Sequence, residues 1–312
     1  MKLGALGEDR LLNQILLDHA HGRVGKVFAG LADDCAILET PRTKRYLVLK
    51  TDCVVEGVHF KHRTNASDLG WKAMMRPLSD FAASSAVPQF ALITLIVPQQ
   101  TRVAWVQGLY RGLRQAANRF KVSVVGGETS NTQGPIAISV TVIGFVEKSR
   151  ATSRRGGKSG DDLFVTGRLG GALKRKHLKF VARVAESRWL TQNFSIHAMM
   201  DLSDGLGADL PRLARTSMLE FDVELEKLPV ASGATIDNAI SEGEDYELLF
   251  AISPRETTRL EREWRRQFPK LQLTRIGSLN RKSPVTDAKQ RPGFSITNRK
   301  LPRGYVHFQQ PR

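Results

Sequence analysis

The sequence predicts a protein of two units, the first an α/β domain and the second an α+β domain. In the first half, short apolar runs alternate with amphipathic helical patterns, which is typical of alternating strands and helices. Near the middle, residues 149–160 form a basic, glycine-rich stretch that breaks this pattern. The length of 312 residues suits about two domains. We therefore expect an N-terminal domain over 1–150 and a C-terminal domain over 151–312.

The elements of the first half follow from the spacing of apolar residues. This spacing predicts helices over 8–20, from about 65–68 onward and over 102–119, and strands at 45–51, 90–97, 122–126 and 136–146. We expect Ser67 to cap the second helix and Pro77 to kink or restart it. The third helix is expected to bury the face that carries Val103, Leu113 and Ala117.

The second half repeats strand, turn and helix. The segment DDLFVTG predicts a strand, 197–216 a strand followed by a helix, and 221–225 and 246–252 further strands. A later helix places Leu260, Trp264 and Phe268 on one face, so its arginines are expected on the solvated face.

The composition limits the class of partner and the location. A net charge of +16 favours either nucleic acid or small anionic substrates. The basic residues are scattered and lack the aromatic interleaving of an RNA-binding sheet, so we expect no nucleic acid. No apolar stretch approaches the ~18 residues of a membrane span, and LGALG is too short for a signal-peptide core. Cys35 and Cys53 imply no disulfide framework, so we expect a cytoplasmic protein that binds no membrane.

Six acidic residues stand where an apolar run stops or just beyond it, and they are Asp34, Asp52, Asp80, Glu128, Asp201 and Asp204. Strands that end in carboxylates would deliver them to one rim of a sheet, and such an oxygen-rich site suits Mg²⁺. Mg²⁺ held in this way commonly holds substrate phosphates as well. Any single acid here is more often a turn former or a helix cap, but the repetition favours metal-assisted phosphate chemistry. The chain has no P-loop and no protein-kinase motifs.

Five segments in order resemble the thiamine-monophosphate kinase family of the aminoimidazole-ribonucleotide-synthetase-like superfamily. They are LADDCAIL, KTDCVVEGVHF, LSDFAASSAVP, VVGGETSNTQGP, and DLSDGLGADL together with SEGEDYELLF. The resemblance runs from about residue 7 to the C-terminal GYVHF. It implies the two-domain architecture of that superfamily and a homodimer formed through the N-terminal sheets. It also implies ATP- and Mg²⁺-dependent direct transfer of a phosphoryl group to thiamine monophosphate.

The resemblance also implies roles for individual residues. The implied metal ligands are Asp34, Thr51, Asp52, Asp80, Glu128, Asp201 and Asp204, of which Asp80 and Asp204 are the expected catalytic residues. Gly126, Gly127, Arg154 and Ser203 match nucleotide-binding positions, and His59, Glu244 and Phe308 match positions of the substrate site.

Several positions depart from the family pattern. Glu128 replaces the usual Asp and has a longer reach, Lys50 replaces a small hydroxyl residue, and Pro77 replaces an Asn. Lys50 either replaces the charge of one metal ion or interferes with it. The segment GGALKRKHLKFVARV is shorter than its family counterpart. Three alternatives therefore stay open: a superfamily enzyme with another acceptor, a nucleotide- or thiamine-phosphate-binding paralogue with impaired catalysis, and a basic nucleic-acid-binding module.

Overall fold

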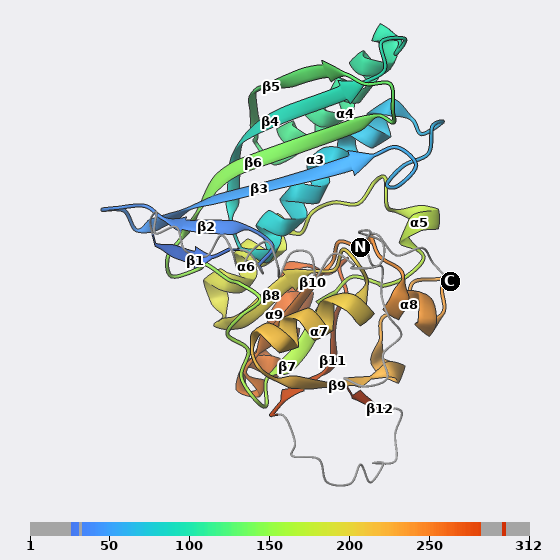
Figure 1. Cartoon of the computed structure of the whole chain (residues 1–312). Coiled ribbons are helices and arrows are strands. Elements are labelled where there is room, and N and C mark those ends of the chain that lie inside the picture. Colours follow the sequence, from blue (N-terminus) through green and yellow to red (C-terminus); the bar gives the residue numbers. More distant parts are fainter. Residues whose placement is uncertain (1–25, 31–32, 282–294, 298–312) are drawn as a thin grey trace, which may run out of the picture.

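The computed structural model describes residues 26–30, 33–281 and 295–297 of the chain. These residues form two six-stranded sheets with their helices, one sheet within 27–147 and the other within 162–297 (Figure 1). The prediction of an α/β and α+β fold is confirmed, and the predicted boundary at 149–160 falls between the two sheets. The helix predicted over 8–20 and the residue Phe308 lie outside the described residues.

The first sheet has the strand order β1-β2-β3-β6-β4-β5. Its strands are β1 (Val27–Ala29), β2 (Ala36–Glu39), β3 (Arg45–Val55), β4 (Val87–Val97), β5 (Ser123–Asn131) and β6 (Ala137–Glu147). The β4–β5 pair is parallel and the other pairs are antiparallel. A parallel pair needs a crossover connection, which α4 (Val103–Arg119) supplies. Together with α3 (Ala66–Ala83), this helix covers one face of the sheet (Figure 1).

Helix α3 begins within the predicted range, but its N-cap residue differs from the prediction and the helix does not restart at Pro77. Asn65, and not Ser67, is the N-cap, because its side-chain oxygen accepts from the backbone N–H groups of Ser67 and Asp68 at 2.9 and 3.2 Å. Pro77 does not end the helix, which runs through it to Ala83. Pro77 itself is buried, and packing on both sides of the helix offsets the hydrogen bond that proline removes.

Small residues bring α3 and α4 close together. A Cβ on Gly70 would lie 2.0 Å from the Leu109 carbonyl oxygen, and one on Gly112 would lie 1.8 Å from the Ser67 oxygen. The buried face of α4 therefore centres on Leu109 and Gly112. The predicted face was wrong for Val103, which is 72% exposed.

The second sheet has the strand order β12-β9-β11-β7-β10-β8, with all pairs antiparallel. Its strands are β7 (Asp162–Thr166), β8 (Ile196–Asp201), β9 (Glu220–Glu224), β10 (Leu248–Ile252), β11 (Leu273–Asn280) and β12 (Ser295–Thr297). Its helices are α5 (Ala172–Arg175), α6 (Val184–Asn193), α7 (Leu206–Thr216), α8 (Ile236–Ser241) and α9 (Pro254–Gln267), and a 3₁₀ turn spans Leu225–Lys227. On α9 the prediction is confirmed, since Leu260 and Trp264 are buried while Arg262, Arg265 and Arg266 are exposed.

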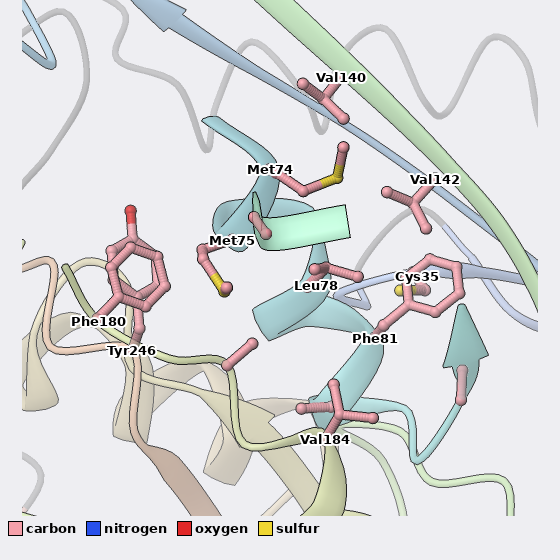
Figure 2. Close-up of a cluster of buried hydrophobic side chains, with 14 of the residues drawn as sticks. Cys35, Met74, Met75, Leu78, Phe81, Val140, Val142, Phe180, Val184 and Tyr246 are labelled. Atoms are coloured by element: carbon pink, nitrogen blue, oxygen red, sulfur yellow. The ribbon is translucent and has the colours of Figure 1, made fainter. Parts of the chain in front are cut away.

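Helix α3 joins the two units through one shared core. Its residues Met74, Met75, Leu78 and Phe81 are fully buried. Figure 2 shows Val142 of β6 on one side of this helix and the stacked rings of Phe180 and Tyr246 on the other, 3.9 Å apart between centroids. A helix buried on both sides places its polar residues at the junction of the two units. Among the described residues, no helix is both long and apolar enough to cross a membrane.

Candidate active site

Three buried carboxylates meet where the two units join. Asp34 precedes β2, Asp80 lies in the last turn of α3, and Asp201 is the final residue of β8. One carboxylate oxygen from each lies within 4.8 Å of the others, and the residues are 4%, 8% and 2% exposed. Buried acids this close suit a shared divalent cation, and an all-oxygen donor set is the kind that Mg²⁺ prefers. The residues present therefore fit a magnesium site.

The electrostatics of this three-acid cluster favour a bound cation. Burial, and then the charge of Asp34, raise the pKa of Asp201 to about 7, although the Ser79 hydroxyl donates to Asp201 at 2.6 Å. Burial also raises the pKa of Asp80 well above its ordinary value, with Lys50 opposing this shift and neighbouring carboxylates adding to it. A cation at this position would stabilise the ionised acids and lower these pKa values.

Two cationic side chains contact the cluster. Lys50 Nζ lies 3.1 Å from Asp80 Oδ1, and Arg154 Nε donates to Asp34 Oδ1 at 3.0 Å. Burial lowers the pKa of Lys50, but Asp80 and then Asp52 outweigh burial and leave this pKa above its ordinary value, so the ammonium stays charged. Lys50 and Arg154, both singled out in the sequence, are thus brought directly to the predicted acids.

The other predicted ligands of the first sheet fall on two different faces. Asp52 directly opposes the core residue Val140, so it points toward the helices and the cluster. Thr51 points the other way, with its Oγ1 3.2 Å from Ser139 Oγ. Glu128 is exposed and, through the register of β5, β4 and β6, lies in the same row as Ser139. Within one chain, the structure therefore does not bring Thr51 and Glu128 to the three acids.

The expectation that strand ends deliver the acids to one rim is wrong for most of them. Asp201 does end a strand, but Asp52 and Glu128 lie inside β3 and β5, and Asp80 lies on a helix. Strands β3 and β5 continue past these acids because the backbone hydrogen bonds of a strand pair do not depend on which side chains the strand carries.

The turn after β8 carries the remaining predicted residues of the second unit. Arg212 Nη1 donates to Asp204 Oδ2 at 2.5 Å, and the Asp204 backbone N–H donates to Asp209 at 3.0 Å. Asp204 is therefore engaged within its own unit and is not part of the three-acid cluster. The carbonyl of Ser203 accepts from the Glu244 N–H at 2.7 Å, which joins two predicted site segments.

A second polar cluster lies at the same junction and centres on Glu244. Lys72, which is fully buried on α3, donates to Glu244 Oε2 and to the His59 carbonyl, both at 2.7 Å. His177 Nδ1 lies 3.0 Å from the same Glu244 oxygen. Burial raises the pKa of Glu244, but His177 and Lys72 outweigh it and lower that pKa. The sequence reasoning missed Lys72. Its signal was a lysine three residues after Leu69 on the apolar face of a helix.

The glycine pair ahead of Glu128 has a structural cause. A Cβ on Gly127 would lie 1.8 Å from the Ile93 carbonyl oxygen, so the pairing with β4 already requires glycine there. At Gly126 the nearest atom would be Leu92 Cδ2 at 3.3 Å, the end of a side chain that can move. Close approach of the backbone to a phosphate stays a prediction for both residues.

Comparisons with known proteins agree with this architecture. Residues 32–146 match the family described as AIR synthase related protein, N-terminal domain. The thiamine-monophosphate kinase of Rhodopirellula baltica is 34% identical over 317 residues, which cover 95% of this chain and 97% of the relative. The thiamine-monophosphate kinase of Aquifex aeolicus is 32% identical over 339 residues, covering 99% of this chain and 100% of the relative.

A solved structure described as AaThiL complexed with AMPPCP and TMP is similar in fold over nearly the whole chain. It has a TM-score of 0.79 and 31% sequence identity, and the match covers 98% of this chain and 99% of that one. Identity above 30% over almost the full length of both chains, together with the shared two-sheet fold, leads to one conclusion. The chain belongs to the thiamine-monophosphate kinase family.

Proposed function

We propose that this protein transfers a phosphoryl group from ATP to thiamine monophosphate and so forms thiamine diphosphate. The observation that carries the proposal is the meeting of Asp34, Asp80 and Asp201 at one junction, within a chain similar over its length to thiamine-monophosphate kinases. A relative with the same fold is described in complex with AMPPCP, a non-hydrolysable ATP analogue, and TMP.

The proposed reaction is a direct in-line transfer. An oxygen of the thiamine-monophosphate phosphate forms a bond to the γ-phosphorus of ATP, the bond from that phosphorus to the bridging oxygen breaks, and ADP leaves. Two polyanions must approach each other, so neutralising their charge matters more than a strong base. Asp34, Asp80 and Asp201 would hold Mg²⁺, which neutralises and orients phosphoryl oxygens. Lys50 and Arg154 bring further positive charge to the same place.

Helix α3 connects the two halves of the proposed site. It carries Asp80 of the three-acid cluster and Lys72, which holds Glu244 and the carbonyl of His59. We assign the His59 and Glu244 side to thiamine monophosphate and the Arg154 side to the nucleotide. On this assignment the phosphate of thiamine monophosphate is directed along α3 toward the metal.

The roles of the remaining site residues are proposals from the family resemblance. Ser203 contacts the nucleotide, Asp204 adds to the metal-binding acids, and Phe308, outside the described residues, covers the thiamine rings. The division into domains 1–150 and 151–312 is supported by the separation of the two sheets.

We also propose a homodimer formed through the open face of the first sheet. This face carries Val87, Phe90 and Leu92, which are 40%, 42% and 39% exposed. Apolar side chains gathered on one sheet face are typical of an interface. A dimer would cover them and bring Thr51 and Glu128, on the same face, into the interface. Sedimentation of wild type and of Phe90→Glu tests this, with a dimer that dissociates in the variant as the expected result.

A cytoplasmic location fits the two free cysteines. Cys35 is buried and Cys53 is exposed, and both are free thiols. An exposed free thiol is typical of a reducing compartment.

The experiment that tests the function is product analysis by chromatography. Purified protein is incubated with ATP, Mg²⁺ and thiamine monophosphate, and in parallel with free thiamine as acceptor. Thiamine diphosphate together with an equal amount of ADP is expected from thiamine monophosphate, and little product from thiamine. Absence of thiamine diphosphate would contradict the proposed function, and ADP formed without it would mean that water accepts the phosphoryl group.

The contact between Lys50 and Asp80 favours one second candidate, a binding protein with impaired catalysis. That candidate predicts binding of AMPPCP and thiamine monophosphate without any product from folded, Mg²⁺-saturated protein. Equilibrium binding measured beside the product analysis separates it from the kinase.

A further inference from the structure

Asp52 is held between two cations of its own chain. Its Oδ2 lies 4.0 Å from Lys50 Nζ, and its Oδ1 lies 3.6 Å from Arg76 Nη2. The same ammonium lies 3.1 Å from Asp80, and Arg76 Nη1 donates to the Cys53 carbonyl at 3.2 Å. The Lys50 ammonium thus lies between the carboxylates of Asp52 and Asp80, as a metal ion would, and Arg76 pairs with the other oxygen of Asp52.

These ion pairs are largely buried, so they are stronger than ion pairs on the surface. The side chains of Lys50, Arg76 and Asp52 are 24%, 13% and 17% exposed, so water screens their charges weakly. Both oxygens of Asp52 face a cation, whereas Arg154 contacts Asp34 through Oδ1. A divalent ion coordinated by Asp52 would lie beside two fixed positive charges, and their repulsion opposes its binding.

The sequence around these cations explains how they reach Asp52. Lys50 lies two residues before it on β3, so both side chains point to the same face of the sheet. Arg76 lies four residues before Asp80 on α3, so these two share one face of the helix. The two cations therefore enter the junction from different elements and meet on one carboxylate.

We propose that Lys50 and Arg76 are built-in cations that take the place of one metal ion beside Asp52, so that metal is held through Asp34, Asp80 and Asp201 without Asp52. Their function is to neutralise the phosphoryl groups that enter the junction. This inference rests on the proposed phosphoryl transfer for the identity of those groups. The metal count that tests it does not depend on turnover.

The test counts bound Mn²⁺ from the electron paramagnetic resonance signal of free Mn²⁺, with AMPPCP present. Mn²⁺ takes the same oxygen ligands as Mg²⁺. Wild type is compared with the double variant Lys50→Thr, Arg76→Val, in which Asp52 loses both cations. We expect the double variant to bind one more Mn²⁺ per chain and Lys44→Thr, an exposed control, to match wild type. An unchanged count in the double variant would overturn the proposal.

A second variant decides the question even if the double variant does not fold. Asp52→Asn removes the carboxylate charge and keeps its shape, and it is expected to bind as many Mn²⁺ ions as wild type. Loss of one ion in Asp52→Asn would show that Asp52 is a ligand and would refute the inference.

The two proposals fail in different ways. If the variants bind Mn²⁺ in the expected numbers but the protein forms no thiamine diphosphate, the proposed function is contradicted and the proposal about Lys50 and Arg76 is not. A chain that forms thiamine diphosphate and loses an ion in Asp52→Asn keeps the function and loses the inference.

Discussion

The buried contact between Lys72 and Glu244 gives a quantitative prediction about how the two units hold together. Lys72→Met keeps the length of the side chain and removes the ammonium. That change removes two hydrogen bonds that the ammonium donates, one to Glu244 Oε2 and one to the His59 carbonyl, both of 2.7 Å. The Lys72 side chain is 0% exposed and that of Glu244 is 15% exposed, so water can do little to replace these contacts.

The size of the effect follows from what remains around Glu244. Breaking one side of a buried ion pair costs about 3–5 kcal/mol, because the partner charge is left uncompensated. His177 Nδ1 stays 3.0 Å from the same oxygen and offsets part of this loss. We therefore expect the low end, about 3 kcal/mol, which is a factor of about 150 in the unfolding equilibrium.

Urea unfolding of wild type and variants measures this cost. Lys179→Met is the matched control, because Lys179 makes a 3.8 Å pair with Asp68 and its side chain is 72% exposed, so its loss is expected to cost less than about 1 kcal/mol. A double-mutant cycle with Glu244→Gln isolates the pair, with an expected coupling of about 2 kcal/mol. If Lys72→Met is as mild as Lys179→Met, or the coupling is near zero, the reasoning is refuted.

Three further predictions concern the acids and the glycine pair. Asp80→Asn is expected to lower turnover by at least about 100-fold while circular dichroism shows an unchanged fold, because the amide lacks the charge that holds metal, and near wild-type turnover would contradict this. In chelator-treated protein, burial and then the charge of Asp34 raise the pKa of Asp201 from 3.8 to about 7. Between these two pH values the folded state binds a proton on Asp201 that the unfolded state has lost. The contribution of Asp201 to the free energy of unfolding therefore falls as the pH rises from about 4 to about 7. Asp201→Asn should remove that part of the pH dependence in urea unfolding at pH values of about 4.5 and 7.5, and an identical slope would exclude this cause. Gly127→Ala is expected to cost about 3 kcal/mol or more, since its Cβ would lie 1.8 Å from a backbone oxygen, whereas Gly126→Ala should cost less than about 1 kcal/mol, and equal costs would contradict the packing argument.

Much of the fold could be predicted from the sequence, because burial periodicity is a local property. The alternation along 136–146 predicted β6, and the helical spacing after 65 predicted α3. The predicted ends of two strands were wrong, because β3 continues to Val55 and β5 to Asn131, through polar residues at which the apolar runs stop. The ordered motifs also indicated the family, which the comparisons confirm.

The assembly of the site was decided only by the tertiary structure. Asp34, Asp80 and Asp201 were each identified in the sequence, but their meeting depends on how α3 packs between two sheets. Thr51 and Asp52 point to opposite faces because successive side chains of any strand alternate. The row that Glu128 shares with Ser139, in contrast, depends on how β5, β4 and β6 pair, which the sequence pattern does not contain.

The cations show the same division between local and tertiary information. The sequence raised two possibilities for Lys50, that it replaces a metal charge or interferes with it, and the structure places its ammonium 3.1 Å from Asp80. The sequence gave no partner for Lys72, which contacts Glu244 only when the two units pack together. A sequence pattern determines which side chains a strand or helix buries, because that depends on neighbours a few residues away. Which buried charges then face one another depends on contacts between segments more than a hundred residues apart, and only the folded chain supplies them.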